Sequence, residues 1–279
     1  NINYTEGIIL GGVFLKGDND NIKKIVKLLK EKYNFRGLLH FTDFSNLNSI
    51  IHIGYLLSRA LCYAYDIEFF DVKTEDSYAN DYVKFYFAEK NHEALHQLKT
   101  PVYLLFSEDL ISLDLSVFFN GANEAAEIKQ EFDFDLKKQT ELLIAEPVSL
   151  KYLKNIIFRC AADYKRACNL YGRNKFYSVE PNMFFHEDNY IKDYSIYYDS
   201  GKHNDLFVLH FSTIFPVKND VNHEYRLYDL NDNLLKTAKI NFLESYSTDF
   251  NLEVKKPEQP VKFKLWFYGI LSIEEIIGE

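Results

Sequence analysis

The chain has 279 residues, of which 47% are hydrophobic and 16% aromatic. This composition excludes a disordered protein and suits one large domain or two of ordinary size. The net charge of −9 argues against general, charge-driven binding of nucleic acid. Because no run of 18 apolar residues occurs, we expect no membrane span. The three cysteines have spacings unlike those of zinc motifs, so we expect reduced thiols, no metal and a cytoplasmic protein.

The first part of the chain predicts strands and helices in alternation. Residues 8–15 predict a strand, and a helix follows from about residue 19, with apolar residues at helical spacing. A short apolar strand is expected at 38–42, and then a helix at 46–53 that Gly54 ends. The next expected elements are strands at 81–87, 101–107, 138–145 and 155–159, a helical turn at 148–154 and a closing helix at 161–171.

After Gly172 the pattern changes to short alternating runs separated by turn residues. These runs lie at 195–198, 206–215, 223–230, 234–242, 250–254 and 261–268. Strands at such regular spacing, with almost no helical pattern, indicate an antiparallel sandwich. The clearest hairpin turns at Asn231-Asp232-Asn233. We therefore expect a first domain over 1–175, of which 1–35 is a strand-helix extension, and an all-β domain over 176–279.

The charge is distributed unevenly along the chain. Residues 151–175 carry seven Lys or Arg residues against the single acid Asp163, a net charge of +6, whereas 176–279 carry ten against seventeen, a net charge of −7. The basic segment has two open interpretations, a rail that binds a nucleic-acid strand or the solvated face of a helix.

The segment 38–59 has the most distinctive order of residues in the chain. His40 and Thr42 alternate on the expected strand, so both side chains should lie on the same face. Asn46, Leu47, Ile50 and the sequence Gly54-Tyr55-Leu56 follow. This order resembles the opening of the DarT-type nucleic-acid ADP-ribosyltransferases, in which His-x-Thr, Asn-Leu, Ile and Gly-x-Leu begin the NAD pocket. The resemblance extends over about residues 36–172.

Three further segments are similar to this family. The sequence Asp-Tyr-Val-Lys-Phe-Tyr-Phe at 81–87 resembles a strand of the family, except that Lys84 stands where the family has a proline. Lys-Lys-Gln-Thr-Glu-Leu-Leu-Ile, which contains Glu141, resembles the segment that carries the family's catalytic glutamate. Gly121-Ala122-Asn123 resembles a loop that precedes the family's substrate-facing loop. The family's arginine has no counterpart in 60–84, so Arg59 is the candidate to replace it.

The resemblance implies an NAD-dependent enzyme and assigns its residues. It implies that Glu141 and Arg59 are catalytic, and that NAD, as co-substrate without a metal, is bound by His40, Thr42, Asn46, Gly54, Leu56 and Tyr86. A carboxylate suits this chemistry, because cleavage of the bond between nicotinamide and ribose builds positive charge on the sugar. For Tyr86 packing in the core is the alternative to stacking on nicotinamide.

We therefore expect an α+β ADP-ribosyltransferase domain with a split β core, followed by the sandwich. The resemblance implies a toxin or phage-defence effector that transfers ADP-ribose to a base of single-stranded DNA. Single-stranded RNA is an almost equally favoured alternative. The acidic C-terminal domain is expected to bind a protein, such as an antitoxin or a chaperone. Two other functions stay open: a non-catalytic sensor of NAD or ADP-ribose, and an enzyme that modifies proteins.

Overall fold

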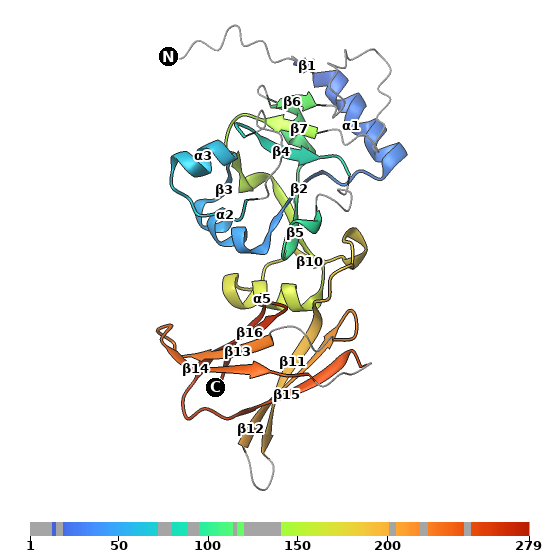
Figure 1. Cartoon of the computed structure of the whole chain (residues 1–279). Helices are drawn as coiled ribbons and strands as arrows, with labels where there is room; N and C mark the ends of the chain where they lie inside the picture. The colour runs from blue at the N-terminus through green and yellow to red at the C-terminus, as the bar shows by residue number, and fades with distance from the viewer. Residues whose placement is uncertain are drawn as a thin grey trace. The chain divides into compact units, whose positions relative to one another are not determined.

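The computed structural model describes residues 13–14, 19–71, 80–88, 95–113, 116–119, 141–200, 205–217, 223–242 and 247–278. The fold is mixed α+β with several antiparallel sheets, which confirms the predicted fold class (Figure 1). The chain divides into two compact units, residues 1–156 and 157–279. This division precedes residue 175, and the domain boundary expected there stays a prediction. No described helix is long and apolar enough to cross a bilayer.

The first unit is built around one twisted sheet. Its strands, in spatial order, are β1 (Val13–Phe14), β6 (Ser116–Phe119), β7 (Glu141–Ile144), β4 (Val83–Tyr86), β2 (Leu38–Asp43), β5 (Pro101–Phe106) and β9 (Leu153–Phe158), the last of which crosses the boundary between the units. A separate antiparallel pair joins β3 (Tyr55–Leu56) and β8 (Val148–Ser149). The helices are α1 (Asn19–Tyr33), α2 (Leu47–Ile53) and α3 (Arg59–Ala64), with 3-10 turns η1 (Phe44–Asn46), η3 (Glu108–Ser112) and η5 (Leu150–Tyr152).

Burial explains why these segments form a sheet. Every residue of β5 is buried, as expected for an apolar strand inside a sheet that is covered on both faces. The antiparallel neighbour β2 pairs with it along its full length, from Leu38 with Phe106 to Asp43 with Pro101. In Figure 1, α2, β3 and α3 lie together on one side of this sheet, away from α1. The expected strands at 8–15 and 138–145 are represented by β1 and β7, and their other residues are largely outside the described ones.

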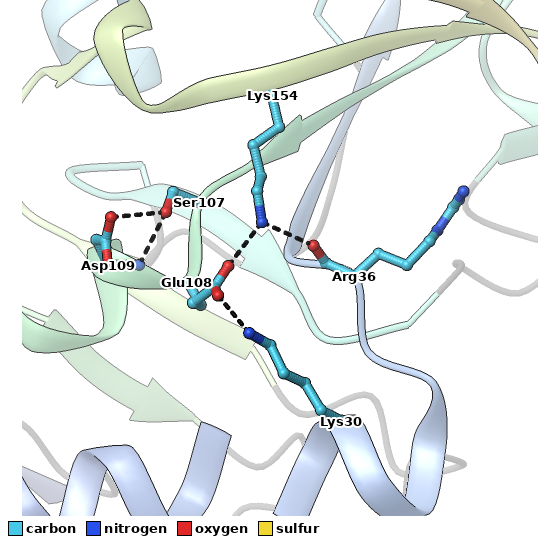
Figure 2. A network of polar contacts seen from close by, with 6 residues as sticks. All are labelled: Lys30, Arg36, Ser107, Glu108, Asp109 and Lys154. Carbon is cyan, nitrogen blue, oxygen red and sulfur yellow. Dashed lines mark hydrogen bonds and ion pairs between the residues drawn. The ribbon is translucent and has the colours of Figure 1, made fainter. Parts of the chain in front are cut away.

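A carboxylate ties the end of α1 to strand β9 of the sheet. Glu108 of η3 accepts from Lys30 at 2.6 Å through one oxygen and from Lys154 at 2.7 Å through the other (Figure 2). Lys154 also donates to the carbonyl of Arg36 at 3.1 Å. Partial burial alone would raise the pKa of Glu108, but the hydrogen bonds from Lys154 and Lys30 outweigh it and lower the pKa to about 2.

The second unit contains a sandwich of two antiparallel sheets, as expected. One sheet has the order β11 (Ile191–Ser200), β12 (Asp205–Thr213) and β15 (Asp249–Lys255). The other has the order β14 (Leu234–Ile240), β13 (His223–Tyr228), β16 (Val261–Phe267) and β17 (Ile270–Ile277). Their inner faces share one core, in which Phe211 of β12 stacks on Phe250 at 5.4 Å and meets Phe267 of β16 at 6.3 Å. The hairpin at Asn231-Asp232-Asn233 joins β13 to β14. The short strand β10 (Tyr177–Val179) and the 3-10 turn η6 (Pro181–Met183) precede the sandwich.

The helix α5 (Ala161–Tyr171) covers one edge of each sheet of the sandwich. Arg166 donates to the carbonyl of Leu271 on β17 at 2.6 Å, and Asn169 donates to the carbonyl of Glu274 at 3.0 Å. Lys165 donates to the carbonyl of Tyr194 on β11. A sheet edge otherwise presents unpaired backbone groups to other chains, so α5 protects both edges.

These contacts also account for much of the basic segment at 151–175. Besides Lys165 and Arg166, Lys154 is bound to Glu108, and Arg159 is buried in an ion pair with Asp163 at 2.7 Å. Four of its seven cations therefore bind groups within the protein.

His223 makes the stability of the second unit depend on pH. Its ring is buried, stacks on Phe267 at 4.7 Å and accepts the Tyr268 N–H at 3.3 Å through Nδ1. Burial lowers the pKa of His223 to about 4. An unfolded histidine takes up its proton near pH 6.5, so the unfolded state gains a proton first as the pH falls.

We therefore expect the free energy of unfolding to fall by about 1–3 kcal/mol between pH 6.5 and pH 4 because of His223. The fluorescence of Trp266, the only tryptophan and part of β16, reports unfolding of this unit. His223→Phe should flatten the pH dependence, although it removes the acceptor of the Tyr268 amide at every pH. If the free energy of unfolding changed with pH equally steeply in the variant and the wild type, this role of His223 would be contradicted.

Candidate functional site

The candidate site lies where two neighbouring strands of the sheet separate. Strands β2 and β4 share one pair of facing residues, Leu39 and Tyr86. Beyond that pair an open cleft of about 1040 Å³ lies beside them, including space open to solvent. Its lining comes from β2, α2, β3, α3, β4 and the segment 67–71. Six of the eight residues predicted to bind NAD or to catalyse line it: His40, Thr42, Asn46, Leu56, Arg59 and Tyr86.

His40 bridges the gap between the two strands. Its Nδ1–H donates to the carbonyl of Lys84 on β4 at 2.9 Å, because a carbonyl can only accept. The side chain thus supplies a contact where the backbones no longer pair. Burial lowers the pKa of His40 to about 4, against the opposite effect of the bond to Lys84. The ring is therefore neutral near pH 7, and its Nε2 has a lone pair that can accept a hydrogen bond.

Asn46 organises the wall of the cleft. Its side-chain amide donates to the Thr42 hydroxyl at 2.9 Å and to the Phe70 carbonyl at 3.1 Å. Its carbonyl oxygen accepts the Phe70 N–H at 2.6 Å. Asn46 therefore acts on the cleft by holding Phe70 and Thr42 in place, and both of these residues line it.

Arg59 presents a cation to the cleft from the first turn of α3. Ser58 caps this helix by accepting the Leu61 N–H at 3.3 Å, which fixes where Arg59 begins it. The Nε of Arg59 lies 2.8 Å from a carboxylate oxygen of Asp71. The other oxygen of Asp71 accepts the Tyr63 hydroxyl at 2.9 Å. Asp71 thus orients the guanidinium.

Gly54 and Leu56 set the path of the chain along one wall of the cleft. Gly54 ends α2 in the left-handed conformation with φ of 77°, which favours glycine. Its carbonyl accepts the Leu150 N–H at 3.0 Å, and Leu56 then pairs with Val148. Gly54 itself is not among the lining residues, but its neighbours Ile53 and Tyr55 are.

Glu141 begins β7 and lies directly opposite Tyr86 of β4. Facing residues of an antiparallel pair project to the same face of a sheet, so Glu141 shares a face with Tyr86. Phe41 is on that face too, with its ring 5.2 Å from the ring of Tyr86. His40 and Thr42 alternate with Phe41 and project to the other face. Glu141 is buried and does not itself line the cleft.

The sequence interpretation missed the second wall of the cleft. Phe69, Phe70 and Asp71 line it, and Tyr63 packs against Phe69 with ring centroids 5.2 Å apart. The available signal was the run Ile-Glu-Phe-Phe-Asp at 67–71, whose two aromatic residues lie beside an acid. Gly121-Ala122-Asn123 lies outside the described residues.

The cleft offers little for thiol or metal chemistry. Cys62 lines it, but burial and the negative charge of Asp71 raise the pKa of the thiol, which favours the protonated and less reactive form. Within the described part of the chain, no group of three or more His, Cys, Asp or Glu side chains could hold a metal ion.

Replacing Asn46 should loosen the wall formed by residues 67–71. Asn46→Ala leaves the N–H and the carbonyl of Phe70 without their side-chain partner, so we expect a loss of about 1–3 kcal/mol in the free energy of unfolding of the first unit. Faster amide hydrogen exchange at Phe70 would report the change directly. Asn48→Ala, at an exposed position of α2, the helix that Asn46 directly precedes, is the matched control and should have no such effect. Equal exchange at Phe70 in both variants would contradict this role.

No family model matches the chain, and no curated protein matches it. The structure is similar to that of Thermus sp. 2.9 DarT in complex with NAD+, with 14% identity, a TM-score of 0.39 and coverage of 53% of this chain and 96% of that chain. It is also similar to the same protein in complex with carba-NAD+, with 13% identity, a TM-score of 0.39 and coverage of 53% and 97%. These structures are of the family that the sequence motifs resemble.

Proposed function

We propose that this protein transfers ADP-ribose from NAD to a base of single-stranded nucleic acid. The observation that carries the proposal is the cleft between β2 and β4. It brings His40, Thr42 and Arg59 to one concave site, and Glu141 stands directly across from its lining residue Tyr86. Perturbed and charged groups gathered in such a cleft are the usual mark of an active site.

The two faces of the sheet suggest how NAD would bind. His40 and Thr42 offer an acceptor nitrogen and a hydroxyl to ribose or amide groups on one side of the strand gap. Tyr86 offers a ring beside Glu141 on the other side, where the nicotinamide riboside would lie. The Arg59 guanidinium lines the same cleft and suits the negatively charged pyrophosphate or the reacting sugar. In this proposal Asn46, Gly54 and Leu56 contribute by shaping the walls.

Glu141 would act on the reacting ribose. The bond between C1′ and the nicotinamide nitrogen breaks, and nicotinamide leaves with the electron pair. The sugar then carries positive charge, which a carboxylate in a water-poor site stabilises. The base nitrogen attacks C1′, and its proton passes to Glu141. Arg59, held by Asp71, would stabilise negative charge near the site.

A single strand suits this reaction, because a paired base hides the edge that must reach the sugar. DNA and RNA remain alternatives, and only contacts with the 2′-hydroxyl would separate them. A role as a toxin or phage-defence effector in the cytoplasm belongs to the same proposal. The segment 176–279, with its net charge of −7, suits a protein partner such as an antitoxin or a chaperone better than a phosphate backbone.

One observation favours a second candidate, a non-catalytic sensor of NAD or ADP-ribose. Glu141 is buried and does not line the cleft, so a ligand could occupy the cleft without meeting a carboxylate there. A sensor would bind NAD equally well after Glu141→Gln and would release no nicotinamide. An enzyme that modifies proteins is a third candidate, and ADP-ribose found on a side chain would identify it.

The direct test incubates the protein with labelled NAD and matched single-stranded DNA and RNA. We expect label on one of the two strands, and a loss of at least about 100-fold in its rate with Glu141→Gln, because the variant has no charge to stabilise the sugar. Glu146→Gln is the matched control, since Glu146 is an exposed glutamate just beyond the same strand. Label on neither strand, with NAD still bound, would contradict the transfer of ADP-ribose to nucleic acid.

A further inference from the structure

The exposed apolar side chains of the first unit lie on one short segment of the chain. Among its described residues, all four large apolar side chains that are exposed lie within 53–65. They are Ile53, Tyr55, Tyr63 and Tyr65, with exposed fractions of 36%, 45%, 65% and 68%. We call these four residues the exposed rim. Such a cluster on one short segment usually marks a binding surface.

Three of the four residues of the exposed rim connect to the cleft. Ile53 and Tyr55, from the end of α2 and from β3, line the cleft directly. Tyr63, on α3, contacts the lining residue Phe69. A ligand that extends out of the cleft on this side would therefore meet the rim.

Tyr63 is held in a fixed orientation although its ring is largely exposed. Its hydroxyl donates to Asp71 at 2.9 Å, and its ring meets the edge of Phe69 at an interplanar angle of 65°. The bond to Asp71 and the negative charge there raise the pKa of Tyr63, so the hydroxyl keeps its proton. The polar end of the side chain is thus used within the protein, and the ring is what Tyr63 offers to a ligand.

The charges on the rim's own segment of the chain favour bases over phosphates as the ligand of the rim. Between residues 52 and 71 the only Lys or Arg is Arg59, which is paired with Asp71. Asp66 and Glu68 are exposed acids on the same segment. Strand-binding surfaces combine cations for the backbone with rings for the bases. The rim supplies the rings, and Lys84, which lines the cleft, and Lys99, whose Nζ lies 5.5 Å from the ring of the lining residue Phe70, supply cations beside it.

We propose that the exposed rim stacks unpaired bases next to the base that is modified, an inference that rests on the proposed function. The cleft would take the reacting base and NAD, and Tyr63 and Tyr65 would take bases flanking it. Because stacking is not screened by salt, the contribution of the rim should be independent of ionic strength, unlike phosphate contacts.

The test measures binding of the full chain to a fluorescent single-stranded oligonucleotide, as DNA and as RNA, without NAD. An abasic strand of the same length keeps the phosphates and removes the bases. The variants are Tyr63→Leu, Tyr65→Leu and Tyr63→Phe, which keeps the ring and loses only the hydroxyl. Tyr197→Leu is the matched control, because Tyr197 is a tyrosine on β11 with a similar exposed fraction, 51%.

We expect Tyr63→Leu and Tyr65→Leu each to weaken binding of the ordinary strand by about 5- to 100-fold, equally at low and high salt. Tyr63→Phe should keep most of the affinity, and Tyr197→Leu should keep all of it. The abasic strand should bind the wild type and both leucine variants alike. Equal affinity of the leucine variants and the wild type for the ordinary strand would overturn the proposal.

Transfer from labelled NAD, measured on the wild type in the same samples, separates this proposal from the proposed function. Strand binding that depends on the rim without any transfer would support the rim and contradict the enzyme. If the leucine variants transfer ADP-ribose to the strand with the same KM for the strand as the wild type, the proposed enzymatic function is supported. The proposal that the rim binds bases is then overturned. Label on protein acceptors, with no strand bound, would overturn both.

Discussion

The separation of β2 from β4 is the constraint on which the rest of the site depends. Strands that are neighbours in a sheet normally satisfy each other's backbone groups along their length, yet these two share one facing pair, Leu39 and Tyr86. Beyond it the side chain of His40 reaches the Lys84 carbonyl in place of a backbone partner. Had the pairing continued, the space of the cleft would have been filled by sheet.

The same separation allows residues that project to opposite faces of the sheet to line one site. In an unbroken sheet, His40 and Glu141 would be divided by the sheet itself, because their strands place them on different faces. Successive residues of one strand, which project to opposite faces, both line the cleft: His40 and Phe41 on β2, and Val83 and Lys84 on β4. Its other wall, residues 67–71, is held to the sheet side by Asn46 and to α3 by Arg59 and Tyr63 through Asp71. A few polar side chains therefore set the width of the site.

Local patterns predicted the elements well, and non-local contacts explain what they missed. The helix at 161–171 and the hairpin at Asn231-Asp232-Asn233 follow from helical spacing and turn residues, and both are present. Strand alternation placed His40 and Thr42 on one face. The partners of Lys165 and Arg166 on β11 and β17 could not be predicted, since they lie far along the chain and are reached only through the fold. Asp71 was missed although it is close to Arg59 in sequence, because only the path of 67–71 brings the two side chains together.

The most direct test of this account is a crystal structure of the protein with a non-cleavable NAD analogue. The account predicts that the analogue occupies the cleft between β2 and β4, in contact with His40 and Thr42. Its nicotinamide riboside should lie beside Tyr86, with the Glu141 carboxylate within hydrogen-bond distance of the ribose 2′-hydroxyl. An analogue bound elsewhere, or one that fills the cleft while Glu141 stays out of reach of the sugar, would contradict it.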